Sequence, residues 1–67
     1  MVNYHRQNRY TAIYPSGNIA GYVNYHEFED GWRFNPMNAA HKPSRKAWKT
    51  ADGAVPAWAK RRGVKLV

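Results

Sequence analysis

The sequence contains no cysteine and no long apolar run. The absence of cysteine excludes disulfides and thiolate metal sites, and it fits a reducing compartment. The three histidines, His5, His26 and His41, follow no zinc-binding spacing. No stretch approaches the roughly 18–20 apolar residues of a membrane span, and the first residues lack the apolar segment of a secretory signal. These absences predict a cytoplasmic protein with no membrane partner.

Acidic residues are also scarce, which limits the catalytic chemistry that the chain can offer. The carboxylates are Glu27, Glu29, Asp30 and Asp52, and the sequence has neither a nucleophile elbow nor a glycine-rich phosphate loop. Glu27 and Glu29 would share one face of an extended strand, but beside a turn they are better explained as solvated side chains. His26 next to them is better explained as an ion-pair partner than as a metal ligand. We therefore predict no enzyme, no metal site and no cofactor.

Aromatic residues supply most of the apolar surface that the chain can bury. The 67 residues predict one small domain, which would be marginally stable without cross-links. The aromatic residues concentrate in residues 27–36, where Trp32 and Phe34 alternate with polar residues as in a half-buried strand. Asp30-Gly31 predicts a turn before this strand, because glycine adopts positive φ without steric cost. We expect the domain to fold around Trp32 and Phe34.

Two earlier segments also predict strands. Residues 9–14 are rich in β-branched and aromatic side chains, and either face of this strand could be buried. Residues 15–18, Pro-Ser-Gly-Asn, predict a tight turn into a second strand over residues 19–25. Gly21 in that strand predicts a bulge or the close approach of a large ring. With the strand through residues 32–34, these segments predict a three-stranded antiparallel β-meander.

The chain after the meander predicts a loop, an edge segment and a helix. Residues 35–43 show no periodicity, and residues 45–49 predict a short edge segment with Trp48 turned inward. Residues 51–62 predict a C-terminal helix that is short or bent, because Pro56 removes a helical hydrogen bond. This helix is expected to pack on the sheet.

The ends of the helix and of the chain complete the predicted fold, which belongs to the α+β class. Thr50 is a suitable N-cap and Gly63 a suitable residue after the helix. Residues 1–8 predict a flexible arm and residues 64–67 a loose tail. The predicted core consists of Ile19, Val23, Trp32, Phe34, Trp48, Val55 and Trp58.

The net charge of +7 is distributed unevenly along the sequence. In residues 1–41 three arginines balance three acids, whereas residues 42–67 hold eight basic residues and one acid. Such an asymmetry is typical of proteins that bind a polyanion, because each neutralised phosphate releases counterions. We predict phosphate contacts from two basic clusters, and the residues expected to make them are Lys42, Arg45, Lys46, Lys49, Lys60, Arg61 and Arg62.

Nucleic acid is the partner that this charge pattern favours, with double-stranded DNA or RNA expected first. Tyr10, Tyr14, Tyr22 and Tyr25 would stack on bases if they lined an exposed sheet face. No element is clearly built to present several base-reading side chains, so the predicted sequence specificity is low. The sequence leaves DNA or RNA, and monomer or homodimer, open.

A second hypothesis is that the protein binds an acidic surface of another protein. The same positive field that attracts phosphates attracts acidic proteins, and exposed Tyr and Arg are typical of binding hot spots. Under this hypothesis the module inhibits a larger partner by occupying an acidic surface.

Three segments carry a resemblance to known proteins. The chain resembles short uncharacterised proteins of phages and prophages of enteric bacteria in residues 31–36 (GWRFNP), 42–46 (KPSRK) and 50–58. The resemblance covers about residues 9–59. It implies a bacterial cytoplasmic setting and an accessory role in infection, such as inhibition of a host protein, and it transfers no functional residue.

The order of three strands and a helix is also similar to the arm-binding domains of phage integrases, which insert their sheet into the major groove. In this sequence the basic residues follow the predicted sheet, and Arg9 and Arg33 are the only arginines in its strands. This departure argues against base reading by the sheet.

Overall fold

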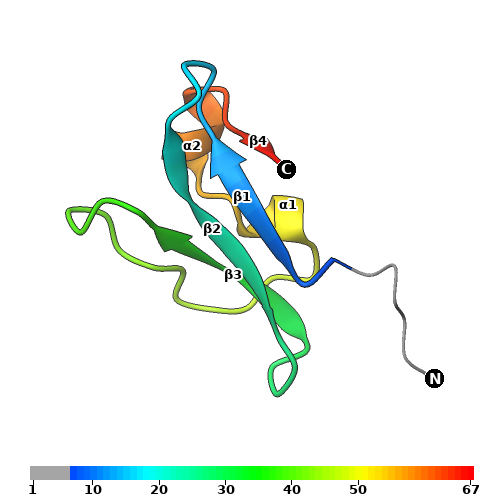
Figure 1. The fold of residues 1–67 in the computed structure, drawn as a ribbon. Coiled ribbons are helices and arrows are strands. Elements are labelled where there is room, and N and C mark those ends of the chain that lie inside the picture. Colours follow the sequence, from blue (N-terminus) through cyan, green and yellow to red (C-terminus); the bar gives the residue numbers. More distant parts are fainter. Residues whose placement is uncertain (1–6) are drawn as a thin grey trace.

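The computed structural model describes residues 7–67, and within them the chain forms an antiparallel sheet with two short helices on one face (Figure 1). The predicted α+β class and meander are confirmed, but the sheet has four strands rather than three, in the order β3-β2-β1-β4. The elements are β1 (Arg9–Ile13), β2 (Ile19–His26), β3 (Gly31–Pro36), α1 (Ala51–Ala54), α2 (Ala57–Arg61) and β4 (Lys65–Leu66).

The fourth strand comes from the segment that the sequence predicted as a loose tail, and that prediction was wrong. Leu66 of β4 pairs with Ala12 of β1, and the backbones of Thr11 and Val67 exchange two hydrogen bonds of 2.9 Å. Gly63, at φ +80°, reverses the chain after α2 and returns it to the free edge of β1. The tail is ordered because it satisfies backbone groups that β1 would otherwise leave unpaired.

The two predicted turns form, but the second uses a different residue. Gly17 has φ +95°, and the backbone of Tyr14 bonds to both Gly17 and Asn18 at 2.8 Å. In the second turn Asp30, at φ +49°, takes the left-handed conformation that we had assigned to Gly31. Aspartate tolerates this region because its short polar side chain bonds locally. Gly31 begins β3 instead.

A bulge in β2 explains why Ile19 is not in the core. Gly21 pairs with Ala12 and Ile19 pairs with Ile13, so Ala20 is an extra residue in β2. The extra residue reverses the alternation of side chains. Ala20 is therefore buried and Ile19 is 39% exposed, so the prediction for Ile19 was wrong.

The core lies between the sheet and the helices. The predicted residues Val23, Trp32, Phe34 and Val55 are buried in it, while Trp58 is half-buried and packs edge-on against Phe34 with ring centroids 5.8 Å apart. Trp48 is 39% exposed, so its assignment to the core was wrong. Small side chains complete the core, namely Ala12, Ala20, Ala54 and Ala59.

Pro56 divides the predicted helix into α1 and α2. The Thr50 hydroxyl accepts a hydrogen bond from the Gly53 backbone N–H at 2.9 Å, which confirms Thr50 as the N-cap of α1. Val55 is extended (φ −67°, ψ 123°), as expected of a residue that precedes proline. Pro56 is the N-cap of α2, so the helical segment bends there as predicted.

Residues 1–6 of the predicted N-terminal arm lie outside the described part of the chain. Asn8, in the remainder of that arm, accepts a hydrogen bond from the backbone N–H of Tyr25 at 2.9 Å. The chain therefore already runs beside β2 before β1 begins.

Candidate functional site

The segment between β3 and α1 is fixed along the outer edge of β3. Trp48 and Trp32 exchange two backbone hydrogen bonds of 2.7 Å, so the predicted edge segment pairs with β3 at this position, but Trp48 is exposed and not turned inward as predicted. Ser44 completes the attachment: its hydroxyl accepts from the Phe34 N–H at 2.6 Å, and its N–H donates to the Phe34 carbonyl at 3.1 Å. Arg33 donates to the Ser44 carbonyl at 2.9 Å. Residues 44 and 48 are therefore anchored, and they position the basic side chains beside and between them.

Gly31 allows this segment to approach the sheet closely. A Cβ on Gly31 would lie 2.6 Å from the Ala47 Cβ and 2.9 Å from the Trp48 carbonyl oxygen. Real Cβ atoms do not make contacts this short, so only glycine fits here. The sequence shows Gly31 as a turn signal, whereas its role in the structure is to admit the 47–48 backbone.

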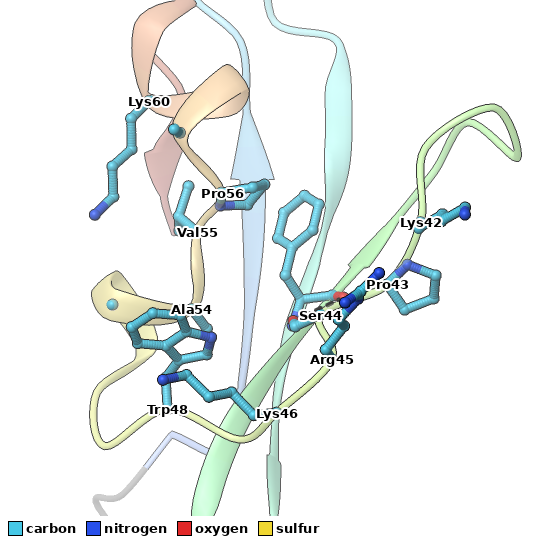
Figure 2. A pocket seen from close by; sticks show the side chains of 13 residues that line it. Lys42, Pro43, Ser44, Arg45, Lys46, Trp48, Ala54, Val55, Pro56 and Lys60 are labelled. Atoms are coloured by element: carbon cyan, nitrogen blue, oxygen red, sulfur yellow. Dashed lines mark hydrogen bonds between the residues drawn. The ribbon is translucent and has the colours of Figure 1, made fainter.

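A hollow of about 680 Å³ lies between this segment and the helices (Figure 2). Its apolar lining includes Phe34, Trp48, Val55 and Pro56. Val55 and Pro56 reach it because the chain is extended between α1 and α2. The break that Pro56 imposes on the helix therefore also forms one wall of the hollow.

Four predicted phosphate-binding residues line this hollow. Lys42, Arg45 and Lys46 come from the segment beside β3, and Lys60 comes from α2 on the other side (Figure 2). No acidic side chain from the described residues lines it. The structure thus brings members of both basic clusters to one concave surface.

The other three predicted residues, Lys49, Arg61 and Arg62, lie outside this lining. All three are exposed. Arg62 lines a separate hollow with Tyr14 and His41, and its guanidinium carbon lies 5.9 Å from the centre of the Trp58 ring. The structure therefore does not gather all seven residues at one hollow.

The charged side chains of the hollow form no salt bridge with any other described residue. Within residues 7–67 Arg33 forms a salt bridge with Glu29. None of the seven residues predicted to bind phosphate forms a salt bridge in this part of the chain. The hydrogen bond from Arg33 holds the pKa of Glu29 below its ordinary value, against the opposing effect of desolvation, and the charge of Arg33 lowers it further. The same bond raises the pKa of Arg33. Arg33 therefore acts within the fold, while the cations of the hollow face solvent.

Trp48 is a candidate contact residue that the sequence had placed in the core. Its backbone bridge to Trp32 holds its position, and its side chain faces the hollow. The Lys46 ammonium lies 4.3 Å from the centre of its ring, within cation–π range. The sequence around Trp48 gives no local signal for this exposure, because apolar residues next to charged ones are also typical of a half-buried strand.

The tyrosines do not form the exposed stacking face that we considered. Tyr10 and Tyr25 each pack against Trp32, with ring centroids 5.4 Å apart, on the face that carries the core. Tyr14 also packs against the core. Tyr22 lies under the guanidinium of Arg9, at 4.1 Å from ring centre to Cζ. Tyr10, Tyr14 and Tyr25 therefore serve mainly the fold.

Other candidate sites are weaker in the part of the chain that is described. Residues 7–67 contain no cluster of three His, Asp or Glu side chains able to hold a metal ion. Glu27 and Glu29 lie in the turn between β2 and β3, so they do not share a strand face. None of the helices in these residues is long and apolar enough to span a membrane.

Comparison of the chain with protein-family models, with curated proteins and with solved structures finds no match.

Proposed function

We propose that this protein is a non-enzymatic basic module that binds nucleic acid through phosphate contacts, with low sequence specificity. The observation that carries the proposal is the hollow beside β3, which Lys42, Arg45, Lys46 and Lys60 line with no acid among the lining residues. Unpaired cations gathered on one surface are what phosphate binding requires. Lys49, Arg61 and Arg62 are exposed and would add contacts at its margins. The proposed setting is the cytoplasm of a bacterial host, as the phage resemblance implies.

The test is binding to a labelled random duplex and to a single strand over a series of salt concentrations, from about 50 to 200 mM. Each phosphate contact contributes about −0.9 to the slope of log affinity against log salt on a duplex and about −0.7 on a single strand. We expect a slope of several units for the wild-type protein. No binding to either form at the lowest salt would contradict the proposal.

Matched lysine variants locate the contact. Lys60 and Lys65 are both exposed lysines of the C-terminal part, and only Lys60 lines the hollow. Lys60→Gln should lower the magnitude of the salt slope by about one contact, whereas Lys65→Gln should leave it nearly unchanged. Equal effects of the two variants would show that net charge alone, and not the hollow, determines binding.

The apolar lining of the hollow favours a second candidate function, inhibition of a host protein. A basic rim around apolar residues also suits an acidic protein segment with one large apolar side chain. This candidate would be preferred if the protein bound no nucleic acid but formed a salt-sensitive complex with a host protein. Lys60→Gln should then weaken that complex, and Lys65→Gln should not.

A further inference from the structure

We propose that the hollow beside β3 receives an unpaired nucleobase, so that the protein prefers single-stranded nucleic acid to duplex. This inference rests on the proposed function and narrows its ligand class. The charge pattern alone predicted a duplex as the ligand. A single strand is proposed here because it would use the apolar lining of the hollow as well as its cations.

The shape of the hollow is the first argument. Its volume of about 680 Å³ lies within the range of about 300–1,000 Å³ that is usual for small-ligand sites. Phosphates alone require an exposed charged surface and no apolar concavity. In a duplex the bases are stacked and paired, so their faces cannot enter a side-chain pocket. An unpaired base can enter, and it brings its phosphates to the rim.

The exposed ring of Trp48 is the second argument. It is 39% exposed although Trp32, its partner in the backbone bridge, is buried. A base can stack on such a ring, and stacking tolerates any base because each has a π-face. Lys46 now lies over the ring at 4.3 Å, and an entering base would displace its ammonium toward the adjacent phosphate. Stacking and phosphate binding would then act at the same nucleotide.

The positions of the cations are the third argument. Lys60 stands on the helix side of the hollow, whereas Lys42, Arg45 and Lys46 stand on the side of the segment along β3 (Figure 2). A strand that crosses the hollow would meet positive charge before and after the inserted base. Low sequence specificity follows, because stacking and phosphate contacts carry little base information.

The decisive experiment compares two single strands that carry the same number of phosphates, and a duplex. An oligothymidine of about 12 nucleotides, an abasic strand of the same length and a random duplex are labelled and titrated with protein at one salt concentration. We expect the oligothymidine to bind about 5- to 150-fold more tightly than the abasic strand, the range for stacking of one base. It should also bind more tightly than the duplex.

Two variants and one control assign the effect to the hollow. Trp48→Ala should bring the affinities for oligothymidine and abasic strand close together. Ala57→Leu should do the same by filling the hollow from an exposed position, without changing any charge. Phe28→Ala removes a fully exposed aromatic residue outside the hollow and should leave the preference intact. Circular dichroism confirms folding, and Ala57→Leu keeps the test valid if Trp48→Ala does not fold.

The possible outcomes separate this inference from the proposed function. Equal binding of the oligothymidine and the abasic strand would overturn base insertion but leave phosphate binding in place. A preference that persists in both Trp48→Ala and Ala57→Leu would also overturn it, because the base would then bind elsewhere. No binding to any strand would overturn the inference and the proposed function together.

Discussion

The sheet and the chain that follows it use their charged side chains in different ways. In β1–β3 and their turns four of the five charged groups contact one another or the fold: Arg33 pairs with Glu29, Asp30 accepts from the Tyr25 hydroxyl, and Arg9 covers the Tyr22 ring. Residues 42–67 hold eight basic residues and one acid, and none of them forms a salt bridge within the described chain, although Lys46 and Arg62 lie over the rings of Trp48 and Trp58.

This difference indicates which charges are available to a partner. A charge that already has a partner in the fold loses that contact when it binds a ligand, whereas a solvated lysine exchanges only water and counterions. The sheet also provides most of the buried aromatic surface, including Trp32 and Phe34, while Trp48 after it stays exposed. We therefore assign stability mainly to the sheet, and the proposed binding would be carried mainly by the chain after it.

The largest expected effect that tests this division is the loss of Trp32. This side chain is buried in the core and packs against Tyr10 and Tyr25. Trp32→Ala should destabilise the protein by about 3–5 kcal/mol, which is comparable to the whole stability expected of so small a domain. Thermal and denaturant unfolding measure the change, with fully exposed Phe28→Ala as the control expected to stay within about 0.5 kcal/mol. A Trp32→Ala variant that melts near the wild-type temperature would contradict the core described here.

A substitution of intermediate effect should disturb both regions at once. Gly31→Ala places a Cβ 2.6 Å from the Ala47 Cβ, so the segment along β3 must shift and its bonds to Trp32 must lengthen. We expect a loss of stability of about 1–3 kcal/mol. Because the same segment carries Lys46 and Trp48, nucleic-acid binding should weaken in the protein that remains folded.

A compensating change checks this explanation. Ala47→Gly in the Gly31→Ala background removes the closest contact and should restore part of the stability, although the contact with the Trp48 carbonyl at 2.9 Å remains. Chemical denaturation of the single and double variants gives the comparison. Wild-type stability of Gly31→Ala would show that the segment is not held against β3.

The parts of the fold predicted correctly from the sequence depend on local chemistry. The Thr50 cap, the helix break at Pro56 and the turn at Gly17 each follow from the conformational preferences of one or a few adjacent residues. The alternation of Trp32 and Phe34 likewise placed both on the buried face. Such signals do not depend on how distant segments meet.

Three of the incorrect predictions, those for Ile19, for residues 64–67 and for Trp48, depend on how strands and segments pair with one another. The bulge that exposes Ile19 is a property of strand register, and the ordering of residues 64–67 requires a partner strand about 55 positions earlier in the chain. The exposure of Trp48 has the same origin, because its backbone bonds to Trp32 set the direction of its ring. The charge asymmetry identified candidate cations, but only the packing shows which of them share a surface.

The smallest expected effect concerns the ion pair of the sheet region. Because the pKa of Glu29 is lowered in the folded state, the unfolded chain binds more protons at acidic pH, and the pairing stabilises the protein above the unfolded pKa. That contribution is lost as the pH falls through the folded pKa. Glu29→Gln should therefore be slightly less stable near neutral pH, and its stability should fall less steeply on acidification. Denaturant midpoints measured from neutral pH to about pH 3 give both curves.

The neighbouring acid provides the control for this prediction. Glu27 lies in the same turn and forms no salt bridge within residues 7–67, so Glu27→Gln should follow the wild-type pH dependence closely. Neither substitution should reduce strand binding, because both carboxylates lie outside the hollow that Lys42, Lys46 and Lys60 line. If Glu29→Gln weakened binding as strongly as Lys60→Gln does, the charges of the sheet would take part in recognition. The division between a structural sheet and a binding segment would then have to be abandoned.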